Sequence, residues 1–238
     1  MITVVIPTLN AETSLAATLT ALVPAVVEGV VREVIVVDGG SSDRTLKIAD
    51  QAGVDLVVSH GGRGQQLAAG AARARFPWLL FLHADTVLEA GWEREAAAFI
   101  ERVDSGAREP AAAAFTFALD DMGVAPRALE ALVRMRCALL RLPYGDQGLL
   151  MPRSLYAEIG GYKPLPLMED VDIVRRLARR QRILLRPKAV TSALRYRNDG
   201  YLARIARNQV CLALYYLRVP AASIARAWSS TSRLLRRS

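Results

Sequence analysis

Hydrophobic residues in the first half of the chain form short continuous runs that alternate with segments of helical spacing. The runs are rich in valine, isoleucine and leucine, whereas the segments between them repeat apolar positions every three or four residues. The expected strands are 2–6, 33–37, 54–59 and 78–82, and the expected helices are 12–23, 43–52 and 65–75. Strands that are apolar throughout are buried on both faces, which is typical of a parallel sheet covered by helices. The pattern therefore predicts an open α/β sheet with right-handed crossovers.

The second half is less regular, but it continues without a repeat, a linker or a low-complexity segment. It is expected to hold strands at 111–119, 149–151 and 183–186 and helices at 92–103, 126–142, 154–159, from 169 onward, 201–217 and 221–237. Pro220 separates the last two helices because proline cannot continue a helix. We interpret residues 1–190 as one α/β domain and residues 191–238 as a basic helical extension.

Polar or conformationally special residues follow each of the first four predicted strands. Open α/β sheets bind ligands beyond the carboxyl ends of their strands, where the loops converge. The four segments are therefore expected to face one crevice and to form a binding site. They read Pro7-Thr8-Leu9-Asn10, Asp38-Gly39-Gly40, Gly61-Gly62-Arg63 and His83-Ala84-Asp85.

Asp38 and Arg63 are the first two candidate ligand-binding residues. A carboxylate at the end of the second strand can accept hydrogen bonds from a base or a ribose, although Asp38 and Asp43 could instead cap the next helix. Ser41 or Ser42 is the expected N-cap of that helix. Arg63 follows a glycine-rich segment that could cradle phosphate, yet the segment lacks both the dinucleotide and the P-loop spacing.

Four further residues suit metal and proton chemistry. Asp85 can hold Mg²⁺ or Mn²⁺, which take oxygen ligands and often share them with substrate phosphates. His83 could touch a ribose, a phosphate or the metal, or be a histidine at the edge of the core. Glu169 and Asp170 begin a helix, where acidic residues also suit the dipole. The preceding proline-rich loop would present Asp170 to a cleft with little water, where a carboxylate is a better base.

The composition and the N-terminal sequence limit the expected kinds of site and the expected cellular location. The chain has two cysteines, Cys137 and Cys211, and two histidines, so neither a disulfide scaffold nor a histidine-rich metal site is expected. The N-terminus lacks the features of a signal peptide, and no apolar run reaches the roughly 18 residues of a membrane-spanning helix. We expect a cytoplasmic protein.

The charge is positive and concentrated toward the C-terminus. The net charge is +8, and after Asp172 sixteen arginines and lysines accompany one acid, Asp199. Such a balance favours a phosphate-rich partner, whether nucleic acid, anionic lipid or diphosphate, although a solvated helix surface would look the same. Arginines mixed with apolar residues, Tyr215 and Trp228 suit a helix on the inner membrane surface, a helix packed on the domain, or a dimer contact.

Four motifs in order resemble those of a family 2 glycosyltransferase, an enzyme with the nucleotide-diphospho-sugar transferase (GT-A) fold. "VVIPTLNAE" resembles the opening nucleotide-binding segment, and "VIVVDGGSSDRT" resembles the segment usually written V-D-D-G-S-x-D-x-T. "FLHADT" stands where the family has its D-x-D motif, and "MEDVDIVRRL" where it has the motif of the catalytic base. The resemblance covers roughly residues 1 to 190.

The resemblance implies a role for each candidate residue. Asp170 would be the catalytic base supported by Glu169, and Asp85 would hold Mg²⁺ or Mn²⁺ on the diphosphate. Asp146 and Gln147 would lie on the acceptor side. The remaining residues would bind the nucleotide sugar: Pro7, Thr8, Asn10, Glu12, Asp38, Gly39, Arg63 and His83.

Two positions depart from the family pattern. Gly39 replaces the second aspartate of V-D-D, and His83 replaces the first aspartate of D-x-D, which weakens the expected ribose contact and metal affinity. The variants "HADT", "GDQG" and "PLMEDV" look most like a bacterial subgroup associated with arsenosugar biosynthesis.

The predicted function is inverting transfer of a sugar from a UDP- or GDP-linked donor to the hydroxyl of a small-molecule or lipid-linked acceptor. One alternative is a sugar-nucleotide nucleotidyltransferase, but its glycine-rich loop should follow the first strand rather than the third. Another is a non-catalytic nucleotide-binding module, which the Glu169-Asp170 pair argues against. Nucleic acid is not an expected partner, because aromatic residues are not interleaved with the basic ones in the sheet half.

Overall fold

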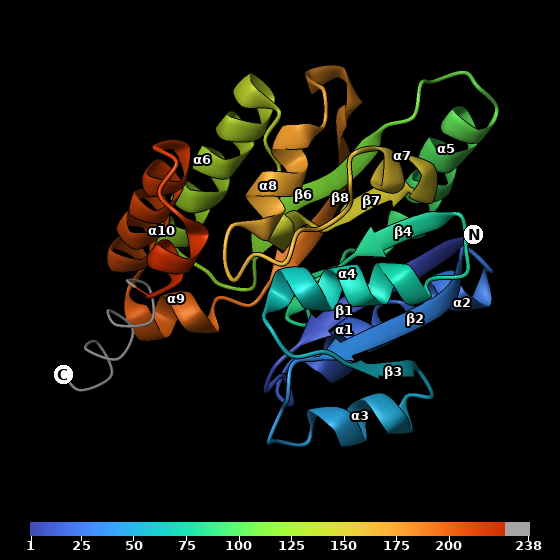
Figure 1. The fold of residues 1–238 in the computed structure, drawn as a ribbon, viewed down its shortest axis with the longest axis horizontal. Coiled ribbons are helices and arrows are strands. Elements are labelled where there is room, and N and C mark those ends of the chain that lie inside the picture. The colour runs from blue at the N-terminus through green and yellow to red at the C-terminus, as the bar shows by residue number, and fades with distance from the viewer. Residues whose placement is uncertain (227–238) are drawn as a thin grey trace.

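The computed structural model describes residues 1–226, which form a single eight-stranded sheet with helices around it (Figure 1). The strand order is β3-β2-β1-β4-β7-β6-β8-β5. The strands are β1 (Ile2–Thr8), β2 (Val31–Asp38), β3 (Asp55–Val58), β4 (Trp78–Phe81), β5 (Thr86–Leu88), β6 (Ala112–Leu119), β7 (Leu149–Pro152) and β8 (Arg182–Thr191).

The first four strands pair in parallel, as the sequence predicts, and the rest of the sheet is mixed. β1 lies between β2 and β4, and β3 pairs with the far side of β2. β7 then runs antiparallel to both β4 and β6, β6 and β8 are parallel, and β5 closes the order antiparallel to β8. The carboxyl ends of β1, β2 and β4 therefore share one edge.

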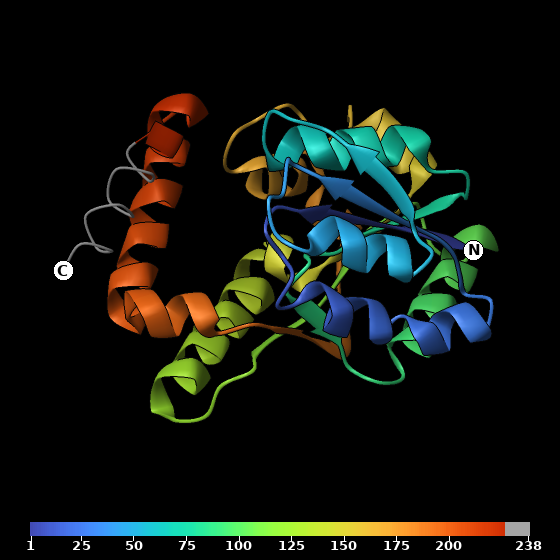
Figure 2. The same ribbon diagram turned by 90° about the horizontal axis from the view of Figure 1, so that it is seen from below.

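Helices cover both faces of the sheet, which Figure 2 shows between α4 on one side and α1, α2 and α5 on the other. The helices are α1 (Leu15–Thr20), α2 (Val23–Val27), α3 (Thr45–Gln51), α4 (Arg63–Arg73), α5 (Trp92–Asp104), α6 (Val124–Leu140), α7 (Arg153–Glu158), α8 (Glu169–Arg176), α9 (Leu194–Asp199) and α10 (Tyr201–Tyr216), with the 3-10 turns η1 (Gly145–Gln147) and η2 (Arg179–Gln181).

The core has two layers because successive strand residues point to opposite faces. In β1, Val5 packs in the layer beneath α4, whereas Val4 and Ile6 pack in the opposite layer. Gly70 lets α4 lie directly on the sheet, since a Cβ there would stand 2.3 Å from Cγ1 of Val5.

Several element boundaries differ from the prediction. The helix expected at 12–23 is two helices, and Pro24 lies at the start of the second. β8 extends from Arg182 to Thr191, beyond the expected 183–186, because it pairs with both β6 and β5. The short elements β5 and α9 were not predicted. Neither Ser41 nor Ser42 is the N-cap of α3. That position is Arg44, and the carboxylate of Asp43 accepts the backbone N–H of Thr45 at 2.9 Å.

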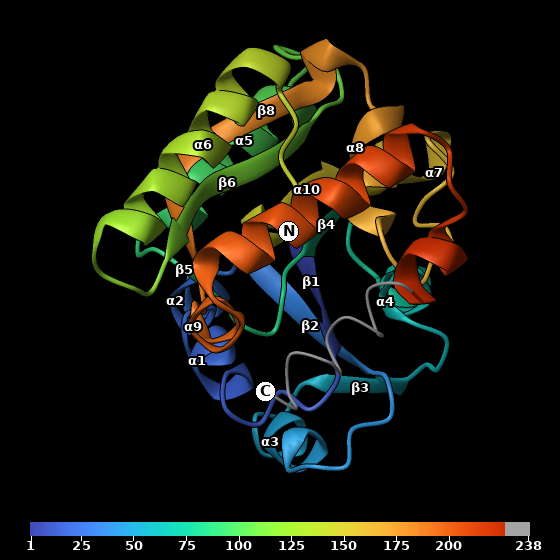
Figure 3. The same cartoon turned by 90° about the vertical axis from the view of Figure 1, so that its left-hand side faces the viewer.

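The described part of the C-terminal extension packs on the domain. Figure 3 shows α10 crossing the side of the molecule on which β1 and β4 end. The Tyr215 hydroxyl donates to Oδ1 of Asp172 in α8 at 3.2 Å, and Ile205 packs against the cluster that contains Leu129 of α6. The segment 227–238, which includes Trp228, lies outside the described residues.

Two properties of the described residues bear on the setting. Among residues 1–226, no helix combines the length and the apolar character needed to cross a membrane. Cys137 and Cys211 are both buried free thiols.

Candidate functional site

The loops that follow β1 and β2 are joined by hydrogen bonds into one unit, which we call the loop platform (residues 7–12 and 38–44). The Gly39 N–H donates to the Thr8 carbonyl at 2.8 Å. The Asn10 N–H donates to Oγ of Ser41 at 2.8 Å, and Oδ1 of Asn10 accepts the N–H of Ser42 at 2.9 Å. Asn10 has a left-handed backbone, with φ of 51°. The carboxyl ends of two strands thus carry a shared, ordered surface.

Two long side chains stabilise this platform, one from α4 and one from the platform itself. Gln66 of α4 is buried, and its Nε2 donates to the carbonyls of Thr8 and Val37, each at 2.8 Å. Oε2 of Glu12 accepts the backbone N–H and Nε of Arg44 at 3.1 and 3.2 Å. Glu12 therefore bridges the two loops. Gln66 was not predicted, because in the sequence it looks like any polar helix residue.

Asp38 lies inside the platform and is only 1% exposed. Its Oδ2 accepts the N–H groups of Gly40 and Ser41 at 2.8 and 2.7 Å, and its Oδ1 accepts the hydroxyls of Thr8 and Ser41 at 3.0 and 2.5 Å. Burial raises the pKa of this carboxyl, but the hydrogen bonds from Ser41, Gly40 and Thr8 outweigh burial, so the net pKa is lowered. Any contact between Asp38 and a base would compete with these donors.

A second group of residues, which we call the charged cluster, lies where the segments after β3 and β4 meet η1 and the start of α8. Its members are Arg63, His83, Asp85, Asp146, Glu169 and Asp170. Nε of Arg63, at the start of α4, donates to Oε1 of Glu169, the first residue of α8. Glu169 is 1% exposed, and its Oε2 has no hydrogen-bond partner. Burial raises the Glu169 pKa, Arg63 opposes this and Asp170 adds to it, with a net rise. Burial lowers the Arg63 pKa, but Glu169 and Asp170 outweigh it, so Arg63 stays a cation.

Asp170 lies at the centre of the charged cluster. Its Oδ2 accepts the Gly145 N–H at 3.0 Å, and its Oδ1 accepts the Val171 N–H at 2.8 Å. A Cβ added to Gly145 would stand 2.8 Å from Nε2 of His83 and 3.1 Å from Oδ2 of Asp170. The segment after β4, the start of η1 and the start of α8 therefore pack so closely that no space remains for a methyl group at position 145.

His83 is uncharged at neutral pH. Burial lowers its pKa well below the ordinary value, and the positive charges of Arg63 and Arg195 lower it further. A neutral imidazole can donate through one ring nitrogen and accept through the other. In this form His83 can bind a hydroxyl or a phosphate oxygen.

Asp85 lies at the edge of the cluster with its side chain 18% exposed, and Nη2 of Arg195 lies 3.7 Å from its Oδ2. The Asp85 carbonyl accepts the N–H of Ser192 at 2.9 Å, which draws the segment after β8 toward the site. Arg195 was counted in the basic tail but was not predicted to reach the site. Its place depends on the pairing of β5 with β8, a contact distant in sequence.

Mg²⁺ and Mn²⁺ prefer oxygen ligands such as carboxylates. Within residues 1–226, no group of three or more histidines, cysteines and acids is placed to hold a metal. Mg²⁺ usually keeps several waters and binds one or two carboxylates together with substrate phosphates. The hard carboxylate of Asp85 fits an ion that arrives on a diphosphate, not an ion held by protein side chains alone.

The two predicted acceptor-side residues have different surroundings. Gln147 is 1% exposed, and its Nε2 donates to the Phe115 carbonyl at 2.9 Å. Its Oε1 accepts from Nη2 of Arg136 at 3.2 Å and from the Tyr144 N–H at 3.3 Å. Gln147 is the last residue of η1, and its buried amide is hydrogen-bonded within the protein.

Asp146 has an enclosed Oδ1 with no hydrogen-bond partner. Burial raises the pKa of Asp146 to about 6, Arg136 opposes the rise, and the negative charge of Asp170 adds to it. The carboxyl is therefore near its titration point under mildly acidic conditions. Asp146 also lies close enough to Asp170 for the two carboxyl groups to interact electrostatically.

The structure divides the predicted site residues into two sets. His83, Arg63, Glu169, Asp170 and Asp146 influence one another's charge, with Asp85 joined to them through Arg195. Gln147, in η1, belongs to neither set. The platform holds the others, and within it the buried Pro7 and Thr8 support the loop while Asn10 is exposed. Its remaining members are Glu12, Asp38 and Gly39.

Solved structures of similar shape identify the class of fold. The crystal structure of S. aureus TarS 1-349 superposes with a TM-score of 0.61 at 18% sequence identity, covering 94% of this chain and 68% of that one. Glucosyl-3-phosphoglycerate synthase from Mycobacterium tuberculosis, in complex with Mn²⁺, UDP-glucose and phosphoglyceric acid, gives a TM-score of 0.59 at 19% identity. That match covers 92% of this chain and 80% of that chain. The chain therefore has the mixed α/β fold of GT-A transferases, as predicted.

A family model adds evidence from the sequence itself. Residues 3–107 match the model described as Glycosyl transferase family 2, which spans the platform, Arg63, His83 and Asp85. No curated protein matches the chain. A third structure, S. aureus TarS 1-349 in complex with UDP-GlcNAc, has a TM-score of 0.57 at 18% identity and covers 80% of this chain and 58% of that one.

Proposed function

We propose that this protein is a glycosyltransferase that moves a sugar from a UDP- or GDP-linked donor to an acceptor hydroxyl, with inversion at the anomeric carbon. The observation that carries the proposal is the convergence of Asp170, the Gly145 N–H and neutral His83 beside the Arg63 cation. The family match over residues 3–107 supports the reaction class, and the UDP-sugars bound by proteins of similar fold support the donor class.

The loop platform is the proposed nucleoside site. Its exposed Asn10, together with Glu12 and the Gly39 backbone, would line the pocket, while Asp38 and Thr8 hold the loops in shape. Since the oxygens of Asp38 already accept four hydrogen bonds, we assign this residue to loop geometry first. Direct contact with a base would require Ser41 to release its hydroxyl.

The proposed diphosphate site lies between Arg63 and Asp85. Asp85 would hold a Mg²⁺ or Mn²⁺ ion, which when bound neutralises charge growing on the leaving diphosphate. Arg63, oriented by Glu169, supplies fixed positive charge to the same oxygens. Arg195 lies 3.7 Å from Asp85 and is free to turn toward phosphate when the carboxylate takes another cation.

Asp170 is the proposed general base. The Gly145 and Val171 N–H groups hold its two oxygens in place, and each oxygen keeps a lone pair that can accept a proton. It would remove the proton from the acceptor hydroxyl as that oxygen attacks the anomeric carbon, a contribution of roughly 10²–10⁴-fold in rate. Asp146 would face the acceptor, and His83 would bind a sugar or phosphate oxygen.

A thermal-shift panel tests the proposal. UDP, GDP and their sugars, each with and without Mn²⁺, are compared with NAD and a short oligonucleotide. Because a ligand stabilises the state it binds, UDP or GDP should raise Tm, and more so with Mn²⁺. Activity assays separate the alternatives. Formation of a sugar nucleotide from a nucleoside triphosphate and a sugar phosphate would indicate a nucleotidyltransferase, and nucleotide binding without turnover of any sugar donor would indicate a non-catalytic module.

The finer assignments rest on the sequence. They are a cytoplasmic location, with or without attachment to the inner membrane face, an acceptor that is either a small molecule or lipid-linked, and membership of the arsenosugar subgroup. The division of the chain at residue 190 is likewise a proposal. The packing of Tyr215 on Asp172 favours an extension held by the domain over one that lies free for lipid.

A further inference from the structure

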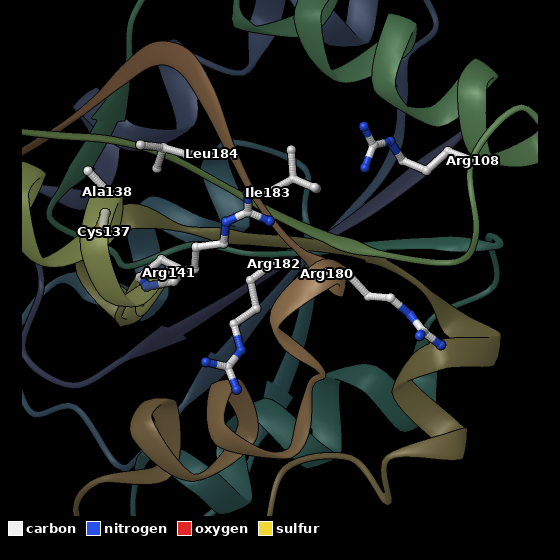
Figure 4. Close-up of a pocket in the computed structure, with 9 residues that line it drawn as sticks. Arg108, Cys137, Ala138, Arg141, Arg180, Arg182, Ile183 and Leu184 are labelled. Atoms are coloured by element: carbon white, nitrogen blue, oxygen red, sulfur yellow. The ribbon is translucent and has the colours of Figure 1, made fainter.

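A cavity of about 580 Å³ opens between the end of α6 and the start of β8 (Figure 4). Four arginines line it, namely Arg108, Arg141, Arg180 and Arg182, around an apolar surface that includes Ile183. Its volume lies in the range of small-molecule sites. None of the residues of the loop platform or the charged cluster lines it, so it is distinct from the proposed donor site.

Positive charge in this cavity is largely uncompensated. Oε2 of Glu109 lies 3.0 Å from Nε of Arg180, and both side chains are more than two-thirds exposed. Among the described residues 1–226, Arg108, Arg141 and Arg182 have no ion pair with an acid. Arg182 instead donates its guanidinium to backbone carbonyls, including that of Leu177. The cavity therefore holds more cations than the protein itself balances.

The surroundings of Arg182 show the same excess. Burial lowers the pKa of Arg182, and the neighbouring charges of Arg179 and Arg175 lower it further, although Tyr216 opposes them. Like charges held together repel, and a bound anion removes that repulsion. Arg175 and Arg179 thus add to the unbalanced positive charge at the Arg182 side of the cavity.

The backbone at Arg141 gives an independent reason. Arg141 ends α6 with φ of 49°, a left-handed conformation in which glycine is the usual residue. An arginine in this position is accommodated at the cost of its Cβ contacts. Figure 4 shows its guanidinium reaching from the end of α6 toward Ile183 and into the cavity. Arg141 thus places a positive charge next to the apolar surface of the cavity, and a ligand there would contact both.

We propose that this cavity binds a phosphate-bearing ligand, with the phosphate held by Arg141 and its neighbouring arginines and an apolar part resting on Ile183. Guanidinium groups bind phosphate oxygens through paired N–H donors, which suits this cluster. Pro143 also lines the cavity and lies two residues before Gly145, whose N–H donates to Asp170. A ligand in the cavity would therefore contact the segment that positions Asp170. The phosphate could come from a soluble compound or from a lipid headgroup.

Binding of dihexanoyl phosphatidic acid below its micelle concentration, measured by isothermal titration on the full chain, tests the proposal. The double variant R108Q/R141Q is compared with R32Q/R94Q, a pair of exposed arginines with the same charge change outside the cavity. We expect the lipid to bind at least tenfold more tightly than inorganic phosphate. R108Q/R141Q should weaken it at least tenfold and R32Q/R94Q should not. No binding by the wild type, or equal weakening by both pairs, would overturn the proposal.

Two additions make the outcome decisive. The pair R108Q/R141G removes the same charges and suits the left-handed backbone at 141, so loss of binding there cannot come from strain. Sedimentation with phosphatidylcholine vesicles containing phosphatidic acid separates the two sources. Pelleting of the wild type but not of R108Q/R141Q identifies a headgroup site, and binding of the monomeric lipid without pelleting identifies a soluble ligand. Pelleting that R108Q/R141Q retains would contradict the assignment of the cavity. UDP binding should be the same in every variant.

Discussion

The loop platform and the charged cluster lie at the same edge of the sheet, but they satisfy their charges in opposite ways. In the platform, Asp38 is surrounded by donors and its pKa falls. In the cluster, Glu169 and Asp146 each keep an enclosed oxygen without a partner, and their pKa values rise. A region that is complete without a ligand provides shape, whereas a region with unmatched polar atoms is where a ligand and its chemistry are expected.

Asp170→Asn should have the largest effect on this comparison. The amide keeps the contact with the Gly145 N–H but cannot take a proton, so kcat should fall by roughly 10²–10⁴-fold. Binding of the nucleotide, measured by titration calorimetry, should be unchanged. Asp50→Asn, an exposed change on α3, is the matched control and should leave turnover intact. Near-normal kcat in Asp170→Asn would remove the base from the mechanism.

Gly145→Ala should come next. The added methyl group would stand 2.8 Å from His83 and 3.1 Å from Asp170, so both side chains must shift. Displacement of a catalytic group by about 1 Å can cost on the order of 10²-fold in rate. Gly53→Ala provides the contrast, because nothing lies within 4 Å of its Cβ position but its φ is 67°. It should lower stability without lowering kcat, and equal activity of the two variants would contradict the geometry.

Asp38→Asn tests the platform through stability. Hydrogen bonds to a charged group are each worth about 1.5–3 kcal/mol, and the amide replaces one oxygen that accepts two of them, so we expect a loss of at least about 3 kcal/mol at pH 7. Because the folded pKa of Asp38 lies below its ordinary 3.8, its stabilisation is full above that pH and is lost as the pH falls further. Urea unfolding should therefore show the two proteins converging at low pH. A difference independent of pH would indicate a purely steric effect.

Asp146→Asn should give the smallest change, and of opposite sign. The folded pKa of about 6 exceeds the ordinary 3.8, so the folded state becomes less stable as the pH rises through this window. The amide removes that cost, which is on the order of 1–3 kcal/mol for a shift of this size. Asp146→Asn should raise Tm relative to the wild type more at pH 7.5 than at pH 4.5. The reverse order would show that Asp146 is paired.

The sequence predicted the parts of the structure that depend on local pattern. The β-branched runs gave four parallel strands, and the acidic pair gave the start of α8 at Glu169. The polar strand ends located the platform and most of the charged cluster. Each of these signals lies within a few neighbouring residues, where periodicity and capping operate.

Partners distant in sequence could not be predicted in this way. Arg195 reaches Asp85 only because β5 pairs with β8, and Gly145 matters because three separate segments leave no room for a side chain. Gln147 was expected on the acceptor side from the resemblance, but the sequence did not indicate its buried hydrogen bonds with Arg136 and Phe115. A sequence states which groups are polar, whereas the fold decides which of them remain available.

The path of the chain beyond β8 limits how the protein can be shortened. β8 itself continues to Thr191, Ser192 anchors the Asp85 carbonyl, and Tyr215 closes over the helix that begins with the acidic pair. A version cut at residue 190 would therefore remove Thr191, which pairs β8 with Thr86 of β5, would leave α8 without the contact from Tyr215, and would lose the cation beside Asp85. Expression of a minimal catalytic fragment should retain the chain at least through Tyr216, the end of α10.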